Sequence, residues 1–557
     1  RSRQITDLLA MWCARMWCAR NVRPMSIIED SGLKDVFKFV EPGYSMPSHT
    51  HVTNILKRKF DVLLEKVKDL LADVDAVSFT TDIWTSHATQ GYMSLTAHFL
   101  RDWSRVSLCL GTVSFPERHT ADNIVDKFAE LTAEFNIQPS AQVALVHDQA
   151  SNMEGAGRHL EVDLPNFSSV TCAAHRLQNT IKRGLETASV SKLLGSARRC
   201  VSHFKHSVVA MEGIRRHQQQ TGDKQLKFVQ EVATRWNSSL HMLERLILLR
   251  RHISAVLSDP AVTKPGDQGL GLSASQYTLA EQLVALLEPF EVTTTIWSGE
   301  LYATISCVVP MAMELAEHLQ DNDDDIAAIA RAKSAMRIDL LNRFHLQADT
   351  VNLECIAAAL DPRFHHLDRF GAERREAIVD EVRMKLREVS TMATPLPSTA
   401  NRVANAEPPA KLKPSGMELI FQQRSQVEPA VEPTITVEEE LELYLAVRQL
   451  GVTSDPLAWW SANAPRFPTI ARLSHRALCA PASSTPSERA FSISGHVAEQ
   501  RRSSLTAENV NMLVMLNRNW SLLIAPSASI QQLRPATVEV ESDSDSSEED
   551  APPLRDV

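Results

Sequence analysis

The sequence has no long apolar run and few cysteines. None of its apolar runs reaches the roughly 18 residues that a membrane-spanning helix needs, and its first residues do not have the pattern of a signal peptide. Eight cysteines in 557 residues are too scattered for a disulfide framework, so we expect a reducing compartment, the cytosol or the nucleus. These absences exclude a membrane protein and a disulfide-stabilised secreted domain.

A basic excess is also lacking, since the net charge is −10. Residues 536–557 hold eight acidic side chains against Arg555, a net charge of −7, which leaves −3 for the rest of the chain. We expect residues 526–557, with their ESDSDSSEED run, to be a disordered acidic tail. The body is then nearly neutral and has room for local basic patches, so charge alone does not decide whether the chain binds DNA.

The length of the chain predicts several packed units rather than one core. Periodicity and the Pro- and Ala-rich stretches divide it into six parts. These are a helical N-terminal region (1–72), the first part of an α/β core (73–190), an all-α insertion (191–390), a linker (391–437), a C-terminal region that completes the core (438–525) and the tail (526–557).

The segment after residue 72 predicts a small sheet with helices between its later strands. Strand-like runs occupy 75–84, 91–100, 104–115, 141–148 and 168–175. An amphipathic helix starts after Thr120, a plausible N-cap, and a second helix precedes the last strand. The expected order is β-β-β-α-β-α-β.

Two of these strands end on an aspartate, Asp82 and Asp148. Parallel neighbouring strands bring their carboxyl ends to one edge of a sheet, where two carboxylates repel each other unless a cation lies between them. Mg²⁺ prefers such oxygen ligands, and a third carboxylate would complete a two-metal site for in-line attack on a phosphodiester. The alternative is that each aspartate caps a turn.

Several motifs resemble those of hAT transposases, closest to the branch with a BED zinc finger. They are RPMSIIED (23–30), FTTDIWTS (79–86), LVHDQASNM (145–153), CAAHRLQN (172–179), TRWNSSLHMLERL (234–246), AALDPRF (358–364) and nearly all of residues 456–520. The resemblance implies an RNase H-like α/β core with a mixed five-stranded sheet, interrupted by a large all-α insertion. This agrees with the strand order and the long helical stretch read from the residues.

The resemblance also implies a catalytic triad of Asp82, Asp148 and Glu488 that holds Mg²⁺ or Mn²⁺. The activity implied is DNA strand cleavage and transfer by a nuclear homodimer or higher oligomer, dimerising through residues 438–520. Taken alone, Glu488 in SSTPSERAFS has the spacing of an ordinary acid that caps a helix start. Residues 508–520 are apolar on most faces, which predicts burial in a core or a subunit interface.

Trp236 and Arg235 correspond to the Arg-Trp pair of that family, which implies that Trp236 stacks on DNA at the cleavage point. An aromatic face offsets roughly 1–3 kcal/mol of the cost of extruding a base. The alternative is a tryptophan packed in the core of the insertion. Arg235 would pair with a phosphate or with a neighbouring acid.

Cys172 and His175 match the family's Cys-x-x-His segment, which implies a place in the catalytic neighbourhood. A zinc site is a second interpretation, because Cys200 and His203 offer another pair at the same spacing and structural zinc takes two separated pairs. Buried cysteines and hydrogen-bonded histidines are the third.

The ligands of a BED finger are not found before RPMSIIED. Cys13 and Cys18 lie in a duplicated MWCAR pentad and are too far apart to form its Cys-x-x-Cys pair. Such a finger either lies upstream of Arg1 or is absent, and Zn²⁺ is expected only with an upstream finger.

Two further functions stay open beside the transposase. One is a domesticated, non-catalytic regulator of transcription that keeps the three acids by descent. The other is an interaction scaffold whose dimer surface and acidic tail recruit chromatin or transcription partners.

Overall fold

The computed structural model describes residues 5–6, 8–9, 25–86, 89–232, 235–391, 435–497 and 506–524. The duplicated pentad with Cys13 and Cys18, nearly all of the linker and the acidic tail lie outside these residues, so their predictions stay predictions. The chain divides into two compact units. One is Lys68–Asn511, and the other is Arg1–Val67 with Met512–Val557. None of the described helices combines the length and apolar character needed to cross a bilayer.

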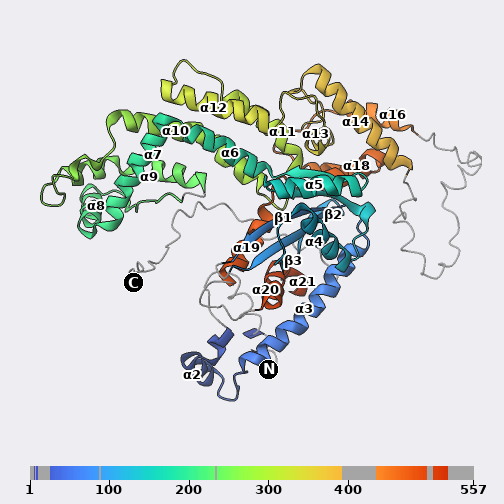
Figure 1. Cartoon of the computed structure of the whole chain (residues 1–557), viewed down its shortest axis with the longest axis horizontal. Coiled ribbons are helices and arrows are strands. Elements are labelled where there is room, and N and C mark those ends of the chain that lie inside the picture. The colour runs from blue at the N-terminus through green and yellow to red at the C-terminus, as the bar shows by residue number, and fades with distance from the viewer. Residues whose placement is uncertain are drawn as a thin grey trace, which may run out of the picture. The chain divides into compact units, whose positions relative to one another are not determined.

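The larger unit contains a mixed sheet of five strands, which confirms the predicted fold class (Figure 1). In spatial order they are β3 (Ser104–Ser114), β2 (Gly91–Arg101), β1 (Val77–Thr85), β4 (Gln142–His147) and β5 (Ser168–Thr171). The β3–β2 and β2–β1 pairs are antiparallel, whereas the β1–β4 and β4–β5 pairs are parallel. Strand β1 therefore lies at the centre, between an antiparallel hairpin and two parallel strands.

The two connecting helices begin close to where the sequence predicts them. Helix α4 (Ala121–Glu134) is capped by Thr120, whose side chain accepts a hydrogen bond from the Asn123 N–H. Helix α5 (Ser151–Asp163) follows β4. The last strand is shorter than predicted and ends at Thr171, because Cys172 already caps the next helix.

The two faces of β1 have different chemistry. Phe79 faces α4, where its ring makes an edge contact with Phe128 at a centroid distance of 5.1 Å. Thr80 points the other way and its hydroxyl lies 2.6 Å from the hydroxyl of Ser487 in helix α19 (Thr485–Val497). Because side chains alternate along a strand, Asp82 lies on the same face as Thr80. That face is therefore the one that helix α19 covers.

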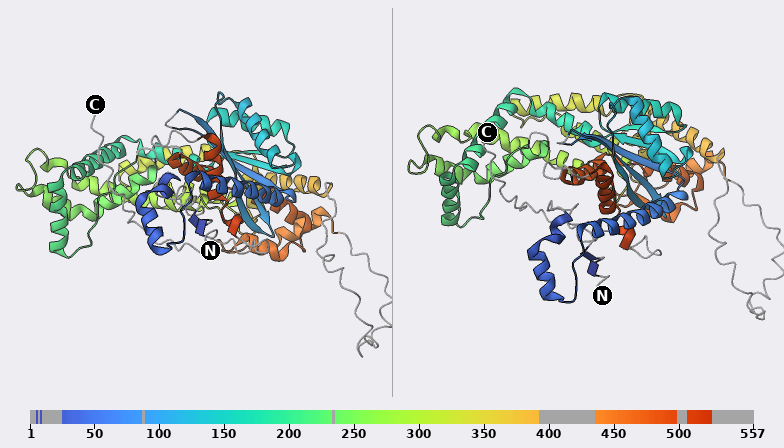
Figure 2. Two further views of the ribbon diagram at one scale, coloured as in Figure 1. Left: turned by 90° about the horizontal axis from the view of Figure 1, so that it is seen from below. Right: turned by 60° about the horizontal axis from the view of Figure 1, so that its bottom comes forward.

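As predicted for residues 176–390, the described residues of this region form helices joined by loops, and they contain no strand. Figures 1 and 2 show its first helices, coloured green to yellow, extending away from the sheet. The helices are α6 (Ala173–Leu185), α7 (Ala188–His206), α8 (Val208–Thr221), α9 (Trp236–Ser258), α10 (Ala274–Trp297), α11 (Val308–His318), α12 (Ala327–Arg343), α13 (Leu353–Ala359) and α14 (Ala372–Thr391). Helices α6 to α12 share one apolar core, which includes Leu243 and Phe290.

A second apolar core joins the sheet to the helices that follow the linker. It contains Val146 of β4, Ile378 of α14 and Trp460, whose indole N–H donates to the Leu360 carbonyl at 2.9 Å. The late helices are α16 (Val437–Leu445), α17 (Pro456–Asn463) and α18 (Pro468–Leu478). Residues beyond the linker therefore complete the same core as the strands.

The smaller unit is helical. Its elements are the 3₁₀ turn η1 (Met25–Glu29), α2 (Ser31–Val40), the part of α3 (His49–Ala72) up to Val67, the part of α20 (Ala507–Arg518) from Met512 and α21 (Ser521–Ile524). Lys66 ties two segments that are distant in sequence by donating a 2.7 Å hydrogen bond to the Leu522 carbonyl. Met512 to Leu516 are buried within the single chain, which confirms the expected burial of this apolar helix.

Candidate active site

Asp82 lies near the end of β1, where the strand reaches solvent. The strand is fully buried from Val77 to Thr81 and becomes partly exposed at Asp82. The carboxylate Oδ1 accepts the Ile83 N–H at 2.9 Å. The Asp82 carboxylate is therefore held where the strand changes from buried to partly exposed.

Asp148 is the residue after β4, the parallel neighbour of β1. The last registered pair is Thr80 with Val146, so Asp82 and Asp148 each lie two residues beyond it, at the same edge of the sheet. Asp148 Oδ1 also accepts the Ala150 N–H at 3.1 Å before α5, so the turn-capping alternative describes one of its contacts. Asp148 therefore both caps the turn before α5 and lies at the sheet edge next to Asp82.

Glu488 comes from the first turn of α19, far along the chain from both aspartates. The preceding residue, Ser487, is hydrogen-bonded to Thr80 of β1, which fixes the helix start against the strand that carries Asp82. The Ser484 hydroxyl donates to Glu488 Oε1 at 3.3 Å, a contact between side chains one turn apart.

The three carboxylates share one electrostatic environment. The pKa of Asp82 is raised to about 7, first by burial and then by the charges of Glu488 and Asp148, while the Ile83 N–H and His175 act in the opposite direction. Carboxylate oxygen atoms are the ligands that Mg²⁺ and Mn²⁺ prefer, so the chemistry of the three side chains suits such an ion. Among the described residues, however, the set of potential metal ligands within 4.8 Å of one another contains Glu488 but neither aspartate. The catalytic assignment of Asp82, Asp148 and Glu488 therefore stays a prediction.

Cys172 and His175 lie beside Glu488. Cys172 is fully buried at the N-cap of α6, and His175 is one turn further along that helix. His175 Nε2 is 3.7 Å from Glu488 Oε1, and potential ligand atoms of all three residues lie within 4.8 Å of one another. The structure thus places the Cys-x-x-His segment next to the third predicted acid.

The hydrogen bond between Cys172 and His175 changes the pKa values of both side chains. The hydrogen bond with Cys172 raises the pKa of His175 to about 10 against the effect of burial. Burial alone would raise the pKa of the Cys172 thiol, but the hydrogen bond and charge of His175 outweigh it and lower that pKa.

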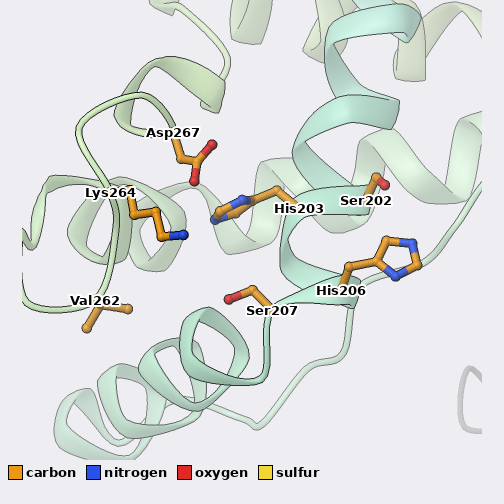
Figure 3. A pocket seen from close by; sticks show the side chains of 7 residues that line it. All are labelled: Ser202, His203, His206, Ser207, Val262, Lys264 and Asp267. Carbon is orange, nitrogen blue, oxygen red and sulfur yellow. The ribbon is translucent and has the colours of Figure 1, made fainter.

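Cys200 and His203 do not join this group. Among the described residues, no set of three or more potential metal ligands includes either of them, so the four-residue zinc interpretation lacks support. Both lie on α7, and burial raises the pKa of Cys200 to about 12, whereas a zinc ligand must be a thiolate. His203 lines an open pocket of about 350 Å³ with His206, Lys264 and Asp267 (Figure 3).

Trp236 and Arg235 lie at the start of α9. Trp236 is only 9% exposed and belongs to the apolar core of the insertion, which is the structural alternative for this residue. Arg235 is exposed, and no ion pair is described for its guanidinium. In this conformation the indole is not available to stack on a base, while Arg235 forms no ion pair with an acid that the structure describes.

The sequence reading missed a ladder of buried hydroxyls that joins the site's elements. The Thr80 hydroxyl contacts those of Thr96 on β2, at 2.5 Å, and Ser487, and Thr96 also contacts His98 Nε2 at 2.8 Å. All four side chains are fully buried. The available signal was Thr80 in FTTD, a polar residue at an inward position of a strand. Only the packing of α19 shows what it binds.

Three family models match separate parts of the chain. The ZBED1 RNase-like domain matches residues 80–176, the ZBED1 RNase-like helical domain matches residues 170–282, and the hAT family C-terminal dimerisation region matches residues 440–520. The first two meet at Cys172–His175, where the sheet gives way to the insertion.

Curated relatives align with most of the chain at low identity. Human "Zinc finger BED domain-containing protein 4" is 24% identical over 94% of this chain and 44% of its own length. The maize "Putative AC transposase" is 22% identical over 89% of this chain and 63% of its own length. The Drosophila melanogaster "Transposable element Hobo transposase" is 23% identical over 57% of this chain and 48% of its own length. The chain spans less than two thirds of each of these proteins.

Proposed function

We propose, from the premise that this chain is a hAT-derived protein of the BED type, that it is a dimeric nuclear DNA-binding protein that cleaves and joins DNA strands with a divalent metal ion. The observation that supports this proposal most directly is the convergence of Asp82, Asp148 and Glu488. Their charges are close enough together to raise the pKa of Asp82 to about 7 after burial has already raised it.

In this proposal the three carboxylates hold the metal. A bound Mg²⁺ or Mn²⁺ supplies Lewis acidity for attack by water or a 3′-hydroxyl on a phosphodiester. Asp82 and Asp148 would hold it from the sheet edge, and Glu488 would hold it from the helix that covers the same face. A protonated His175 would place a positive charge 3.7 Å from Glu488, where it would offset negative charge at the site.

Dimerisation and DNA binding rest on the family and not on a described interface. The chain carries the hAT dimerisation region at residues 440–520, and relatives that match most of the chain include a protein named as a transposase. Arg235 is the proposed phosphate contact on the insertion, since it is exposed and has no described acidic partner. Recruitment of chromatin partners by the acidic tail stays a separate proposal.

A nicking assay on supercoiled DNA with Mg²⁺ or Mn²⁺ tests the enzyme. We expect strand breaks that depend on the metal and are lost in Asp82→Ala and Glu488→Gln, because each removes one carboxylate from the set. Asp126→Ala is the matched control, since this acid is exposed on α4. Activity that survives Asp82→Ala, or that needs no metal, contradicts the proposal.

The second candidate is a DNA-binding regulator without cleavage activity. It is favoured by the human relative, whose name refers to a zinc finger and not to transposition. A regulator shows DNA binding that weakens steeply as salt rises, because phosphate contacts release counterions, and it shows no nicking. A scaffold that binds only proteins shows neither result.

A further inference from the structure

Three side chains of different chemistry meet at the start of the insertion. Cys172 offers a sulfur atom, His175 a ring nitrogen and Glu488 a carboxylate oxygen, and these atoms are within 4.8 Å of one another. The first two share one face of α6, since they are three residues apart around its first turn. The third comes from α19, so two separate helices close around one point.

These sulfur, nitrogen and oxygen ligand atoms suit a different metal ion from the one that the carboxylates alone would bind. Zinc takes sulfur, imidazole and carboxylate ligands at about 2.0 to 2.3 Å in a tetrahedral arrangement, which puts ligand atoms about 3.3 to 3.7 Å apart. Side chains within 4.8 Å of one another reach that spacing after a shift of roughly 1 Å. Magnesium is hard and octahedral and does not select a thiolate.

The surroundings of the three side chains favour a metal-binding form. The Ser484 N–H donates to Cys172 Sγ at 3.3 Å, which stabilises negative charge on sulfur and fixes its position. His175 Nδ1 is buried and has no hydrogen-bond partner among the described residues. The start of α6 thus holds a sulfur atom that accepts one backbone N–H beside a ring nitrogen without a described partner.

We propose that Cys172, His175 and Glu488 bind a thiophilic divalent cation such as Zn²⁺, with water as the fourth ligand. The site shares Glu488 with the carboxylate set of the proposed function, and in that respect it rests on that function. Glu488 bound to zinc is withdrawn from Asp82 and Asp148, so the two metal sites exclude each other. Zinc then inhibits Mg²⁺-dependent cleavage, and excess Mg²⁺ does not restore it unless the zinc is chelated.

Cobalt(II) titration of the purified chain tests the site without reference to cleavage, because a Co²⁺–thiolate bond gives a charge-transfer absorption. We expect this band at one equivalent of Co²⁺ and its loss when Zn²⁺ is added. Cys172→Ser abolishes the band, while His175→Ala and Glu488→Gln weaken Co²⁺ binding about tenfold or more. Cys200→Ser is the matched control and leaves the band unchanged, because Cys200 lies in the insertion core.

Each outcome separates this proposal from the cleavage proposal. A chain that gives no thiolate band, or whose band is lost in Cys200→Ser but kept in folded Cys172→Ser, overturns the zinc site whether or not it cuts DNA. A band that depends on Cys172 together with an absence of nicking supports the zinc site and counts against the enzyme. Circular dichroism of each variant shows that a lost band does not come from unfolding.

Discussion

The sheet and the helical insertion both bury polar groups, but they connect them differently. On the α19 side of the sheet, fully buried hydroxyls and imidazoles lie between apolar residues, and they include Ser78, Thr80, Thr96, His98 and Ser487. The Thr80 hydroxyl contacts those of Thr96 and Ser487, so these side chains join two strands to a distant helix. In the insertion, buried polar side chains such as Gln218 and Thr293 donate to backbone carbonyls beside a large apolar core. A buried polar group costs free energy unless it is hydrogen-bonded, so the sheet uses contacts between side chains to hold them in fixed positions, while the insertion satisfies its polar groups locally.

The largest effect is expected from Trp236→Ala in the insertion. Removing a nearly buried indole leaves a cavity, and the free energy of unfolding should fall by about 3 kcal/mol or more, measured by chemical denaturation. Trp236→Phe keeps most of the packing and serves as the control. If Trp236→Ala is as stable as wild type but loses DNA binding, the DNA-stacking interpretation is right and the core interpretation is wrong.

Asp82→Asn should stabilise the metal-free protein at neutral and higher pH. Because the pKa of Asp82 is about 7 in the folded chain and its ordinary value is 3.8, the unfolded chain ionises first as pH rises. Wild-type stability is therefore lost between about pH 4 and pH 7 and stays low above pH 7. Asp82→Asn does not ionise and so lacks this loss. Its free energy of unfolding should exceed that of wild type by about 2 to 4 kcal/mol at pH 8 and should differ little from it at pH 4.

The same variant gives the metal test a second measurement. Mn²⁺ should raise the melting temperature of wild type at pH 8, since it supplies the missing positive charge, and should raise that of Asp82→Asn much less. Equal stabilisation of the two proteins would mean that Asp82 does not contact the ion. A wild type that is already the more stable protein at pH 8 without metal contradicts the burial of the charge.

Ser487→Ala tests whether the hydroxyl ladder positions Glu488. It removes the partner of Thr80 and should cost about 1 to 2 kcal/mol of stability while also weakening Mn²⁺ binding. Ser474→Ala is the matched control, because Ser474 is equally buried and its hydroxyl has no described partner. A loss of stability with unchanged Mn²⁺ affinity would limit Ser487 to a structural role.

The smallest effect is expected at a helix cap. Thr120→Ala removes the side chain that accepts the Asn123 N–H at the start of α4 and should lower stability by about 1 kcal/mol. Thr120→Ser, which keeps the hydroxyl, should behave like wild type in thermal denaturation. Equal losses in both variants would point to packing of the threonine methyl group and not to capping.

Local pattern predicts the sheet well, because alternation of side chains is a property of each strand by itself. The order of strands and helices along the chain, the cap at Thr120 and the placement of Asp82 and Asp148 at one edge all follow from it. Glu488 could be found only through family resemblance, since no local rule joins a helix start to strands so distant in sequence. The resemblance identified Glu488, and the contact of Ser487 with Thr80 is the physical reason that Glu488 lies beside β1.

Pairings between helices were harder to predict. Spacing places Cys172 and His175 on one face of α6, but it does not say whether α7 or α19 packs against that face. The zinc interpretation therefore paired Cys172 and His175 with Cys200 and His203, whereas in the structure Glu488 lies beside them. Trp236 was undecided for the same reason, because an amphipathic pattern does not tell a buried stripe from one that receives a ligand.

The chain leaves the sheet after β5 and comes back beside the same point, where the Ala173 N–H donates to the Ala482 carbonyl at 2.9 Å. About 300 residues separate these partners, and at ribosomal speeds of about 5 to 20 residues per second their synthesis takes about 15 to 60 seconds. During that interval the newly made strands already present both aspartates, while the glutamate has not yet been translated. A nascent or prematurely terminated chain is therefore unable to assemble the complete set of acids, and any cutting of DNA awaits a finished polypeptide.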